Sequence, residues 1–200
     1  SASPEQIQKT IEELRSKCAA PNFPSSLIFV IGENGFDLAL NLGFPHQLIL
    51  KVGNWLGPLL VAAAESQVKK LLLFGYHGKL VKLAGGIFHT HHHLADGRLE
   101  VLTAIAIAEE IPLPLINKIR TAVSVQSALL IVESTDPKLA KNLWNRLAAV
   151  VEQRSAAYLS NYGSWSVEIG AALFDRQRQM RWAGPLGSKQ LQDFGVACEL

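Results

Sequence analysis

The chain has 200 residues, 48% of them hydrophobic, which is enough to form the buried core of one domain. Its 19 basic and 17 acidic residues nearly balance, whereas a protein that binds nucleic acid usually concentrates positive charge. We therefore expect no nucleic acid among its partners. No charged segment followed by an apolar run opens the sequence, and acidic residues and prolines at 109–114 interrupt its longest apolar region. We expect a soluble, cytoplasmic protein with no membrane partner.

The two cysteines, Cys18 and Cys198, stand at opposite ends of the chain. They do not form the closely spaced pair of a metal or redox motif. We predict buried or free thiols in a reducing compartment rather than a disulfide.

The first part of the chain alternates between apolar runs and helical segments. Ser3 and Pro4 begin a predicted helix that should end near Lys17, because Gln6 is placed to bond back to the serine cap. Short apolar runs at 27–31, 48–52 and 70–74 are typical of buried strands, and the segments 36–42 and 56–68 between them are predicted helices. Three strand–glycine–helix units in succession predict a parallel sheet.

The rest of the chain is predicted to be mainly helical until its last strands. Residues 95–111 form a long predicted helix, and a helical section with a start at Asp136 and Pro137 follows. Apolar stretches at 166–174 and 179–183 predict a hairpin or two late strands. The expected fold is α/β, with three layers, a mostly parallel sheet and helices on both faces. We expect a single domain over residues 1–200.

Residues 75–100, GYHGKLVKLAGGIFHTHHHLADGRLE, concentrate histidines, lysines and glycines directly after a predicted strand. A buried strand, a glycine turn and a basic helix start form the layout of an anion-binding edge in α/β proteins. The loops at 32–35 and 53–54 should reach the same edge. A single glycine loop is more often an ordinary turn, but three such loops beside this segment favour a site.

The segment 75–100 resembles the signature of the cobalt-precorrin-5B C1-methyltransferase family (CbiD type) of anaerobic cobalamin biosynthesis. The match runs through Gly75, Gly78, Lys79, Leu80, Lys82, Gly86, Thr90, His91, Asp96, Arg98 and Glu100. Weaker similarity covers residues 31–57. The resemblance covers the second half of that family's chain, so it implies a partner: the N-terminal half or its equivalent.

The resemblance implies methylation of cobalt-precorrin-5B at C1 to give cobalt-precorrin-6A, or the substrate-binding domain of that enzyme. It implies S-adenosylmethionine as methyl donor, with cobalt only as part of the substrate. We expect the chain alone to bind weakly and to turn over little or nothing. Two alternatives stay open: a non-catalytic corrinoid-binding or scaffold domain of the same pathway, and a histidine-rich metal-dependent hydrolase. The oligomeric state is also open, a homo-oligomer included.

A polycarboxylate tetrapyrrole requires several positive charges and helix N-termini in its binding site. The expected substrate-binding residues are Gly78, Lys79, Lys82, Thr90 and Arg98. We predict that the three basic residues share a pocket with His91 at the carboxyl edge of the sheet. Two simpler interpretations compete: an isolated lysine pair is more often a solvated face, and Asp96, Arg98 and Glu100 could form a structural ion-pair group that holds the loop.

His91 and Asp96 are the expected catalytic residues, since either side chain could take a proton. The neighbouring histidines, at 89, 92 and 93, invite a metal-site interpretation and could share one side of a helix start. Adjacent histidines in a strand point to opposite faces, however, and the sequence contains no His-Glu-x-x-His motif. We predict no metal site.

The loop at 32–35, Gly-Glu-Asn-Gly, resembles a shortened nucleotide-binding loop but lacks the spacing of G-x-G-x-x-G. The second predicted strand also ends without the acid that would bind a ribose. The commonest Rossmann-type mode for S-adenosylmethionine is therefore unsupported. The expected cofactor-binding residues are Glu33, Asn34, Gly35 and Asn54, with Glu33 and Asn34 at the ribose or the amino-acid end.

Overall fold

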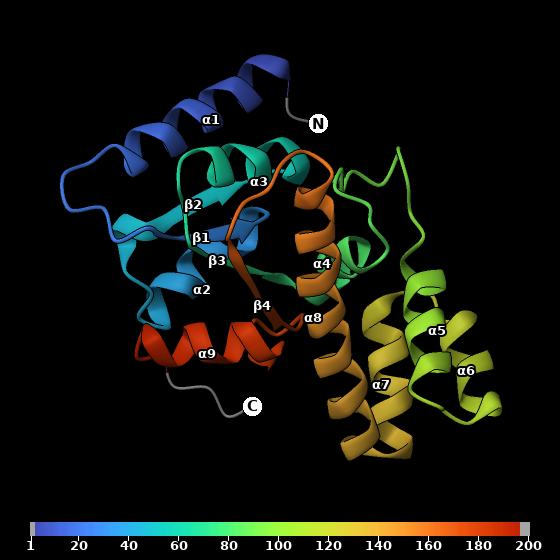
Figure 1. Cartoon of the computed structure of the whole chain (residues 1–200). Helices are drawn as coiled ribbons and strands as arrows, with labels where there is room; N and C mark the ends of the chain where they lie inside the picture. The colour runs from blue at the N-terminus through green and yellow to red at the C-terminus, as the bar shows by residue number, and fades with distance from the viewer. Residues whose placement is uncertain (1–2, 197–200) are drawn as a thin grey trace.

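The computed structural model describes residues 3–196, which form a five-stranded sheet in the order β2-β1-β3-β4-β5 (Figure 1). The strands are β1 (Ser26–Ile31), β2 (Ile49–Val52), β3 (Lys70–Tyr76), β4 (Glu168–Phe174) and β5 (Met180–Ala183). The first four strands are parallel, and β5 pairs antiparallel with β4. The prediction of a mostly parallel sheet that late strands join is confirmed.

Helices cover both faces of this sheet. One face carries α1 (Pro4–Cys18), α3 (Leu56–Glu65), α4 (His77–Ala84) and α8 (Pro137–Ser160). The other face carries α2 (Phe36–Asn41) and α9 (Pro185–Asp193). Phe29 of β1 belongs to the apolar core on the first side and Ile28 to the core on the second. Because both faces are buried, the strands are continuous apolar runs rather than alternating ones.

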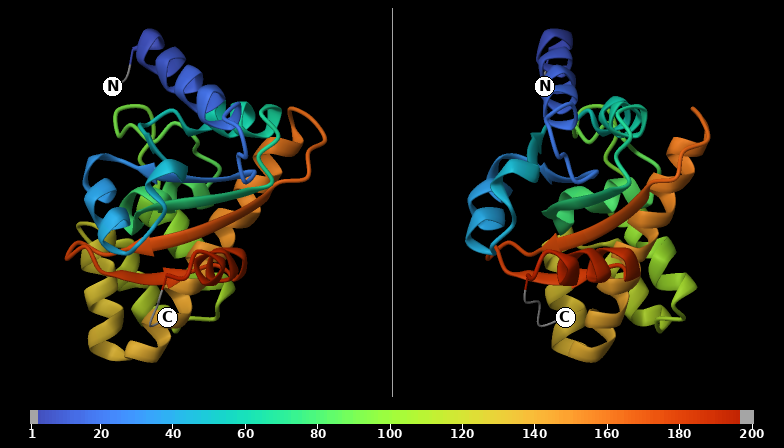
Figure 2. Two further views of the ribbon diagram at one scale, coloured as in Figure 1. Left: turned by 90° about the vertical axis from the view of Figure 1, so that its left-hand side faces the viewer. Right: turned by 60° about the vertical axis from the view of Figure 1, so that its left-hand side comes forward.

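A helical block lies between β3 and β4 in the sequence. It consists of α5 (Arg98–Ala108), α6 (Leu113–Arg120) and α7 (Val125–Thr135), which pack with one another and against α4 and α8. In the views of Figures 1 and 2, α1 lies at one end of the molecule and α7 at the other. No helix within residues 3–196 is long and apolar enough to cross a membrane.

Two predicted helix starts are confirmed in atomic detail. At α1, the Ser3 hydroxyl accepts the backbone N–H of Gln6, and the Gln6 side chain accepts the backbone N–H of Ser3 at 2.9 Å. At α8, the Asp136 carboxylate accepts the backbone N–H groups of Lys138 and Leu139 at 2.9 and 3.2 Å. Each cap satisfies N–H groups that a helix leaves without internal partners.

The helix predicted at 95–111 was too long, since α5 begins at Arg98 and ends at Ala108. Gly97, at φ 56°, is in the left-handed region, which ends the preceding loop and sets the start of the helix. Cys18 is a half-buried free thiol whose burial raises its pKa, and Cys198 lies outside the described residues.

The strand order creates a crevice between β1 and β3. From β1 the chain passes through α2 to β2, and it then crosses through α3 to β3 on the opposite side of β1. The direction of winding reverses there, which makes it a topological switch point. In open α/β sheets, ligands bind at such points, beyond the carboxyl ends of the strands.

Candidate functional site

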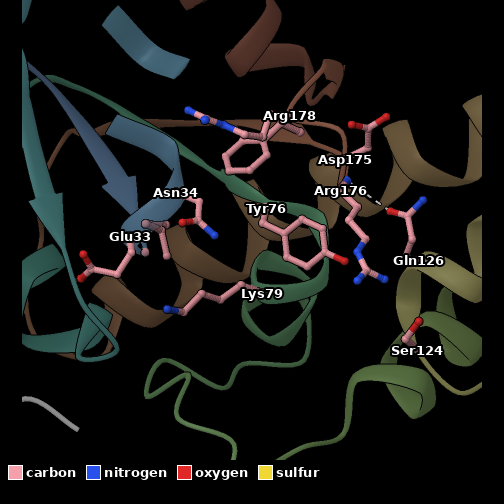
Figure 3. A pocket seen from close by; sticks show the side chains of 12 residues that line it. Glu33, Asn34, Tyr76, Lys79, Ser124, Gln126, Asp175, Arg176 and Arg178 are labelled. Carbon is pink, nitrogen blue, oxygen red and sulfur yellow. Dashed lines mark hydrogen bonds between the residues drawn. The ribbon is translucent and has the colours of Figure 1, made fainter. Parts of the chain in front are cut away.

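Two cavities of about 370 Å³ each lie at the carboxyl edge of the sheet. The switch-point cavity is lined by Ile31, Gly32, Glu33, Asn34, Tyr76, Lys79, Ser124, Gln126, Phe174, Asp175, Arg176 and Arg178 (Figure 3). The loop cavity is lined by Asn54, Tyr76, Gly78, Lys79, Lys82, Thr90, His91, His92 and Arg98. Tyr76 and Lys79 line both, so they form a shared wall.

The loop cavity brings together all five expected substrate-binding residues and His91. These residues come from α4, from the loop at 88–97 and from the start of α5. The position expected for this group is therefore the one observed. Their roles in binding stay predictions, and the contacts of each residue distinguish them.

Lys82 is held by the protein itself. It is 2% exposed, and its ammonium donates to the backbone carbonyls of Thr90 and Ala95 at 3.1 and 2.6 Å. Burial lowers the pKa of this lysine. Two of its three N–H donors are thus used to hold the loop at 88–97 against α4, which makes Lys82 mainly a structural element of the cavity.

Thr90 and Asn54 join two loops across the cavity. The backbone N–H of Thr90 donates to the backbone carbonyl of Asn54 at 2.9 Å, and the Thr90 hydroxyl donates to the Asn54 side-chain oxygen at 3.0 Å. The adjacent residues Trp55 and His89 form an isolated antiparallel bridge, and their rings meet edge to face at 4.0 Å. The Thr90 hydroxyl proton is therefore already donated within the protein.

Arg98 and Asp96 form a two-point ion pair, with nitrogen–oxygen distances of 2.5 and 3.0 Å. The hydrogen bond from Arg98 lowers the pKa of Asp96, and Asp96 raises the pKa of Arg98. A carboxylate with a lowered pKa is a weaker base, and Asp96 does not line the loop cavity. This geometry favours the structural interpretation of the pair over the expected catalytic role of Asp96, although Glu100 joins no ion pair within residues 3–196.

The histidine run lies in a loop and a turn rather than on a helix start. His91 is partly buried, and this burial is the main cause of its lowered pKa. The ring centroids of His91, His92 and His93 lie 4.1 to 5.0 Å from one another. In the part of the chain that the structure describes, no three His, Cys, Asp or Glu residues are placed to hold a metal ion.

Two of the four expected cofactor-binding residues, Glu33 and Asn54, line a third cavity of about 490 Å³ together with Gly53 and Trp55. Glu33 and Asn34 line the switch-point cavity, where Glu33 pairs with Lys51 at 2.5 Å, a contact that lowers the Glu33 pKa. Gly35 is buried and does not line the cavity; a Cβ there would lie 2.8 Å from Val30 Cγ1, so a small residue is needed for packing. Asn54 also lines the loop cavity.

Gly32, which follows β1, lies next to the side chain of Lys79 from α4. Gly32 has φ 94°, a conformation that side chains disfavour, and a Cβ there would lie 3.4 Å from Lys79 Nζ. The lysine is half-buried, and desolvation lowers its pKa despite the opposing effect of Glu33. Within residues 3–196 its ammonium makes no hydrogen bond or ion pair. Lys79 is thus a cation available to a ligand.

Sequence reasoning missed the contributions of α7 and of the β4–β5 turn. The residues missed in the switch-point cavity are Tyr76, Ser124, Gln126, Asp175, Arg176 and Arg178. The polar turn at 175–178 had indicated only a hairpin. Its importance comes from the position of β4 beside β3, which brings the end of β4 to the edge where β1 and β3 also end.

His77 helps to hold α7 and the β4–β5 turn, which line the switch-point cavity, in place. It is fully buried, its Nδ1 accepts the indole N–H of Trp144 at 2.8 Å, and its Nε2 therefore carries the proton and donates to Gln126 Oε1 at 2.9 Å. Desolvation lowers the pKa of His77 to about 4. The same Gln126 oxygen accepts the backbone N–H of Arg176 at 3.3 Å. The neutral imidazole thus fixes both α7 and the β4–β5 turn.

Comparisons with known proteins agree with the signature in residues 75–100. The family model "CbiD, C-terminal domain" matches residues 89–185. The cobalt-precorrin-5B C(1)-methyltransferase of Prochlorococcus marinus (strain MIT 9303) is 64% identical over 199 residues, which cover 100% of this chain and 52% of that protein. The chain belongs to the CbiD family. The resemblance inferred from the sequence is confirmed.

Other members of the CbiD family give the same alignment. The protein of the same name from Prochlorococcus marinus (strain NATL2A) is 57% identical, with 98% of this chain and 51% of that protein covered. That from Parasynechococcus marenigrum (strain WH8102) is 55% identical, with 96% and 54% covered. The chain thus spans about half the length of the curated relatives it matches. No solved structure matches it.

Proposed function

We propose that the chain is the corrinoid-binding part of a cobalt-precorrin-5B C1-methyltransferase, and that its loop cavity receives carboxylate arms of the tetrapyrrole. Relatives at 55–64% identity carry that enzyme's name. The observation that carries the proposal is the ammonium of Lys79, which lines the loop cavity, is half-buried and makes no hydrogen bond or ion pair within residues 3–196. Lys82 and Arg98 also line the cavity, but each already has partners in the protein. A half-buried cation without a partner suits a carboxylate arm.

The first turn of α4 adds to this positive potential. No side chain caps the helix at Tyr76, so the N–H groups of its first turn are available to an anion. Gly78 lies in this turn, and a Cβ there would lie 2.5 Å from the Tyr76 ring. The absent side chain lets that ring pack against the helix start. A carboxylate in the loop cavity can therefore meet both backbone N–H groups and the Lys79 ammonium.

The reaction requires positioning rather than a protein nucleophile. A macrocycle carbon supplies the electron pair of the new C–C bond to the methyl group of S-adenosylmethionine, the proposed donor. The electron pair of the broken C–S bond stays on sulfur, which leaves the neutral thioether of S-adenosylhomocysteine. Holding the two reactants in line supplies most of the rate. His91 is the base available to a proton that the macrocycle releases, since its lowered pKa keeps it neutral near pH 7.

A binding titration tests the corrinoid site. Lys79→Ala should weaken cobalt-precorrin-5B binding by roughly tenfold or more, because a hydrogen bond to a charged group is lost. The melting temperature should change little, since Lys79 Nζ has no partner within residues 3–196. Anaerobic absorbance titration at low salt measures the affinity. Lys118→Ala, on the exposed side of α6, is the matched control. Equal affinity in the two variants would contradict the carboxylate-binding role.

The second candidate function is corrinoid binding without methyl transfer. The chain spans about half the length of each relative. Anaerobic assays of the chain with S-adenosylmethionine, with and without the other half of a relative supplied in trans, distinguish the two. We expect turnover only with both halves, because a misplacement of about 1 Å in such a site costs on the order of 100-fold in rate. The hydrolase alternative finds no support in the described side chains.

A further inference from the structure

The third cavity, of about 490 Å³, lies between the first turns of α1 and the loop that follows β2. Its residues come from α1, from the loops after β1 and β2 and from the start of α3: Gln6, Ile7, Lys9, Thr10, Glu33, Gly53, Asn54, Trp55 and Leu59. The corrinoid site proposed for the loop cavity uses no residue of α1. The α1 side of the third cavity is therefore a surface without an assigned partner.

The first half of α1 contributes little to the core. Leu14 is fully buried, and Ile11 and Cys18 pack partly against the core, all from the middle of the helix onward. In both views of Figure 2, α1 lies at the top and its N-terminal end points away from the sheet. Ile7 is only half-buried there, and the residues beside it are exposed. Ile7 thus lines a cavity where a packed helix would place it in a core.

The opposite wall of the third cavity contains polar groups without partners. The indole N–H of Trp55 is buried and meets no acceptor within residues 3–196, and both ring nitrogens of the adjacent His89 are buried without a partner there. Lys9, on the α1 side, makes no ion pair among the described residues. Buried polar groups in native proteins are nearly always hydrogen-bonded, so a buried donor without an acceptor favours a surface where a partner supplies one.

The relatives contain a second half that this chain does not match. The matched part is 51–54% of three of them, and the family model that matches is named for the C-terminal domain. Interfaces between domains of this size bury roughly 600–1,500 Å². Such interfaces have an apolar centre and a polar rim. The third cavity has this composition, with Ile7, Trp55 and Leu59 among its apolar residues and Gln6 and Lys9 exposed beside them.

We propose that the N-terminal half of the CbiD chain docks on the third cavity. An apolar side chain of that half packs between Ile7 and Leu59, and one of its oxygen atoms accepts the indole N–H of Trp55. The proposal holds whether that half belongs to the same polypeptide or to a separate one. It rests on membership of the family and not on the proposed function.

A half docked in this position reaches both of the other cavities. Asn54 lines the third cavity and the loop cavity, and Glu33 lines the third cavity and the switch-point cavity. Trp55 forms a bridge with His89, at the start of the loop at 88–97. Contact with Trp55 therefore also holds the loop that lines the loop cavity. Docking would thus order the binding residues as well as cover them.

Competition between variants tests the surface without requiring the N-terminal half to fold alone. The chain is co-expressed with a tagged N-terminal half of the Prochlorococcus marinus (strain MIT 9303) protein, and each variant then competes with the isotope-labelled unmodified chain in the purified complex. Ile7→Glu should compete at least roughly tenfold more weakly, because a charge enters an apolar contact. Trp55→Phe keeps an aromatic ring and loses the N–H, so it should compete about fivefold more weakly. Ile107→Glu, 60% exposed on α5, is the matched control and should compete normally.

Three results would overturn the proposal: no complex with the unmodified chain, equal competition by Ile7→Glu and Trp55→Phe, or the strongest loss in Ile107→Glu. Circular-dichroism melting of each variant shows whether it is folded. Sedimentation of the chain alone tests the other occupant, since a dimer that Ile7→Glu dissociates would identify a second copy and also overturn the proposal. Ile7→Glu should bind cobalt-precorrin-5B like the unmodified chain, because Ile7 does not line the loop cavity. Failure of docking and failure of the corrinoid site are therefore distinguishable.

Discussion

The two cavities share the wall formed by Tyr76 and Lys79 and differ in how their cations are held. In the loop cavity, Lys82 is bound to two backbone carbonyls and Arg98 to a carboxylate. In the switch-point cavity, Arg176 contacts no carboxylate within residues 3–196. The number of basic residues in a segment therefore does not measure the charge that a ligand meets. The contacts that each cation already makes determine it.

The walls of the cavities also depend on different buried residues. His77, without exposed surface, holds the switch-point side through Gln126, and Lys82 holds the loop side through the carbonyls at 90 and 95. Each is a buried polar group. Replacing either residue leaves its buried partner without a hydrogen bond. This lowers the free energy of unfolding by more than the hydrogen bond itself contributes to it. The two residues can therefore be changed separately to test whether the cavities are independent.

The largest expected effect is the pH dependence that His77 confers. Its folded-state pKa of about 4 lies below the unfolded value near ~6.5, so the unfolded chain binds more protons between these pH values. The contribution to stability is complete above pH ~6.5 and falls as the pH drops toward 4, by about 3 kcal/mol in total. Urea unfolding at pH 7 and pH 4.5, for the unmodified chain and for His77→Gln, measures it.

The other histidines are present in both proteins, so the difference between the two pH profiles isolates His77. We expect His77→Gln to be less stable at pH 7 and to lose less stability on acidification. If the free energy of unfolding fell equally in the two proteins between pH 7 and pH 4.5, His77 would become protonated in the folded state as easily as in the unfolded chain. That result would contradict the interpretation that a neutral His77 imidazole holds the residues that line the switch-point cavity.

A smaller effect is expected from Lys82→Met. The variant keeps most of the side-chain length and leaves the carbonyls of Thr90 and Ala95 without their donor, which should cost about 2 kcal/mol. Corrinoid binding should weaken with the loosened loop. Lys79→Met is the matched control, since its ammonium makes no hydrogen bond within residues 3–196. Equal destabilisation by the two substitutions would contradict the structural role of Lys82.

Local signals in the sequence were sufficient for most of the fold. The Ser3–Gln6 capping box and the Asp136 cap appear as predicted, because each depends on residues only two or three positions apart. Helix α9 was missed although Pro185 marks its start. Its first N–H groups, at Leu186 and Gly187, donate to the buried Glu152 of α8. The sequence around a helix does not reveal a cap supplied by a distant residue.

The candidate site was predictable in the segment 75–100 and in the loops that follow β1 and β2, which supply Glu33, Asn34 and Asn54. The positions of Lys79, His91 and Arg98 followed from one continuous segment. The contribution of Arg176 did not, because it depends on β4 pairing with β3 across the whole helical block. Lys82 was predicted to bind substrate carboxylates. That it also holds the loop at 88–97 could not be predicted, since its partners there are backbone carbonyls, which no residue type indicates.

The smallest effect is expected at the Asp96–Arg98 pair, and it decides between the two interpretations of the loop cavity. Asp96 is exposed and paired, so Asp96→Asn should change stability by less than about 1 kcal/mol. A catalytic base would behave differently, since its loss typically reduces kcat by a factor of roughly 100 or more. In assays that contain both halves of the enzyme, we expect Asp96→Asn to reduce kcat only a few-fold, because Arg98 loses the partner that holds it in position. His91→Gln, which removes the base expected in the same cavity, should reduce kcat far more. A loss of kcat in Asp96→Asn as large as in His91→Gln would restore Asp96 as a catalytic residue, and would show that the ion pair opens during the reaction.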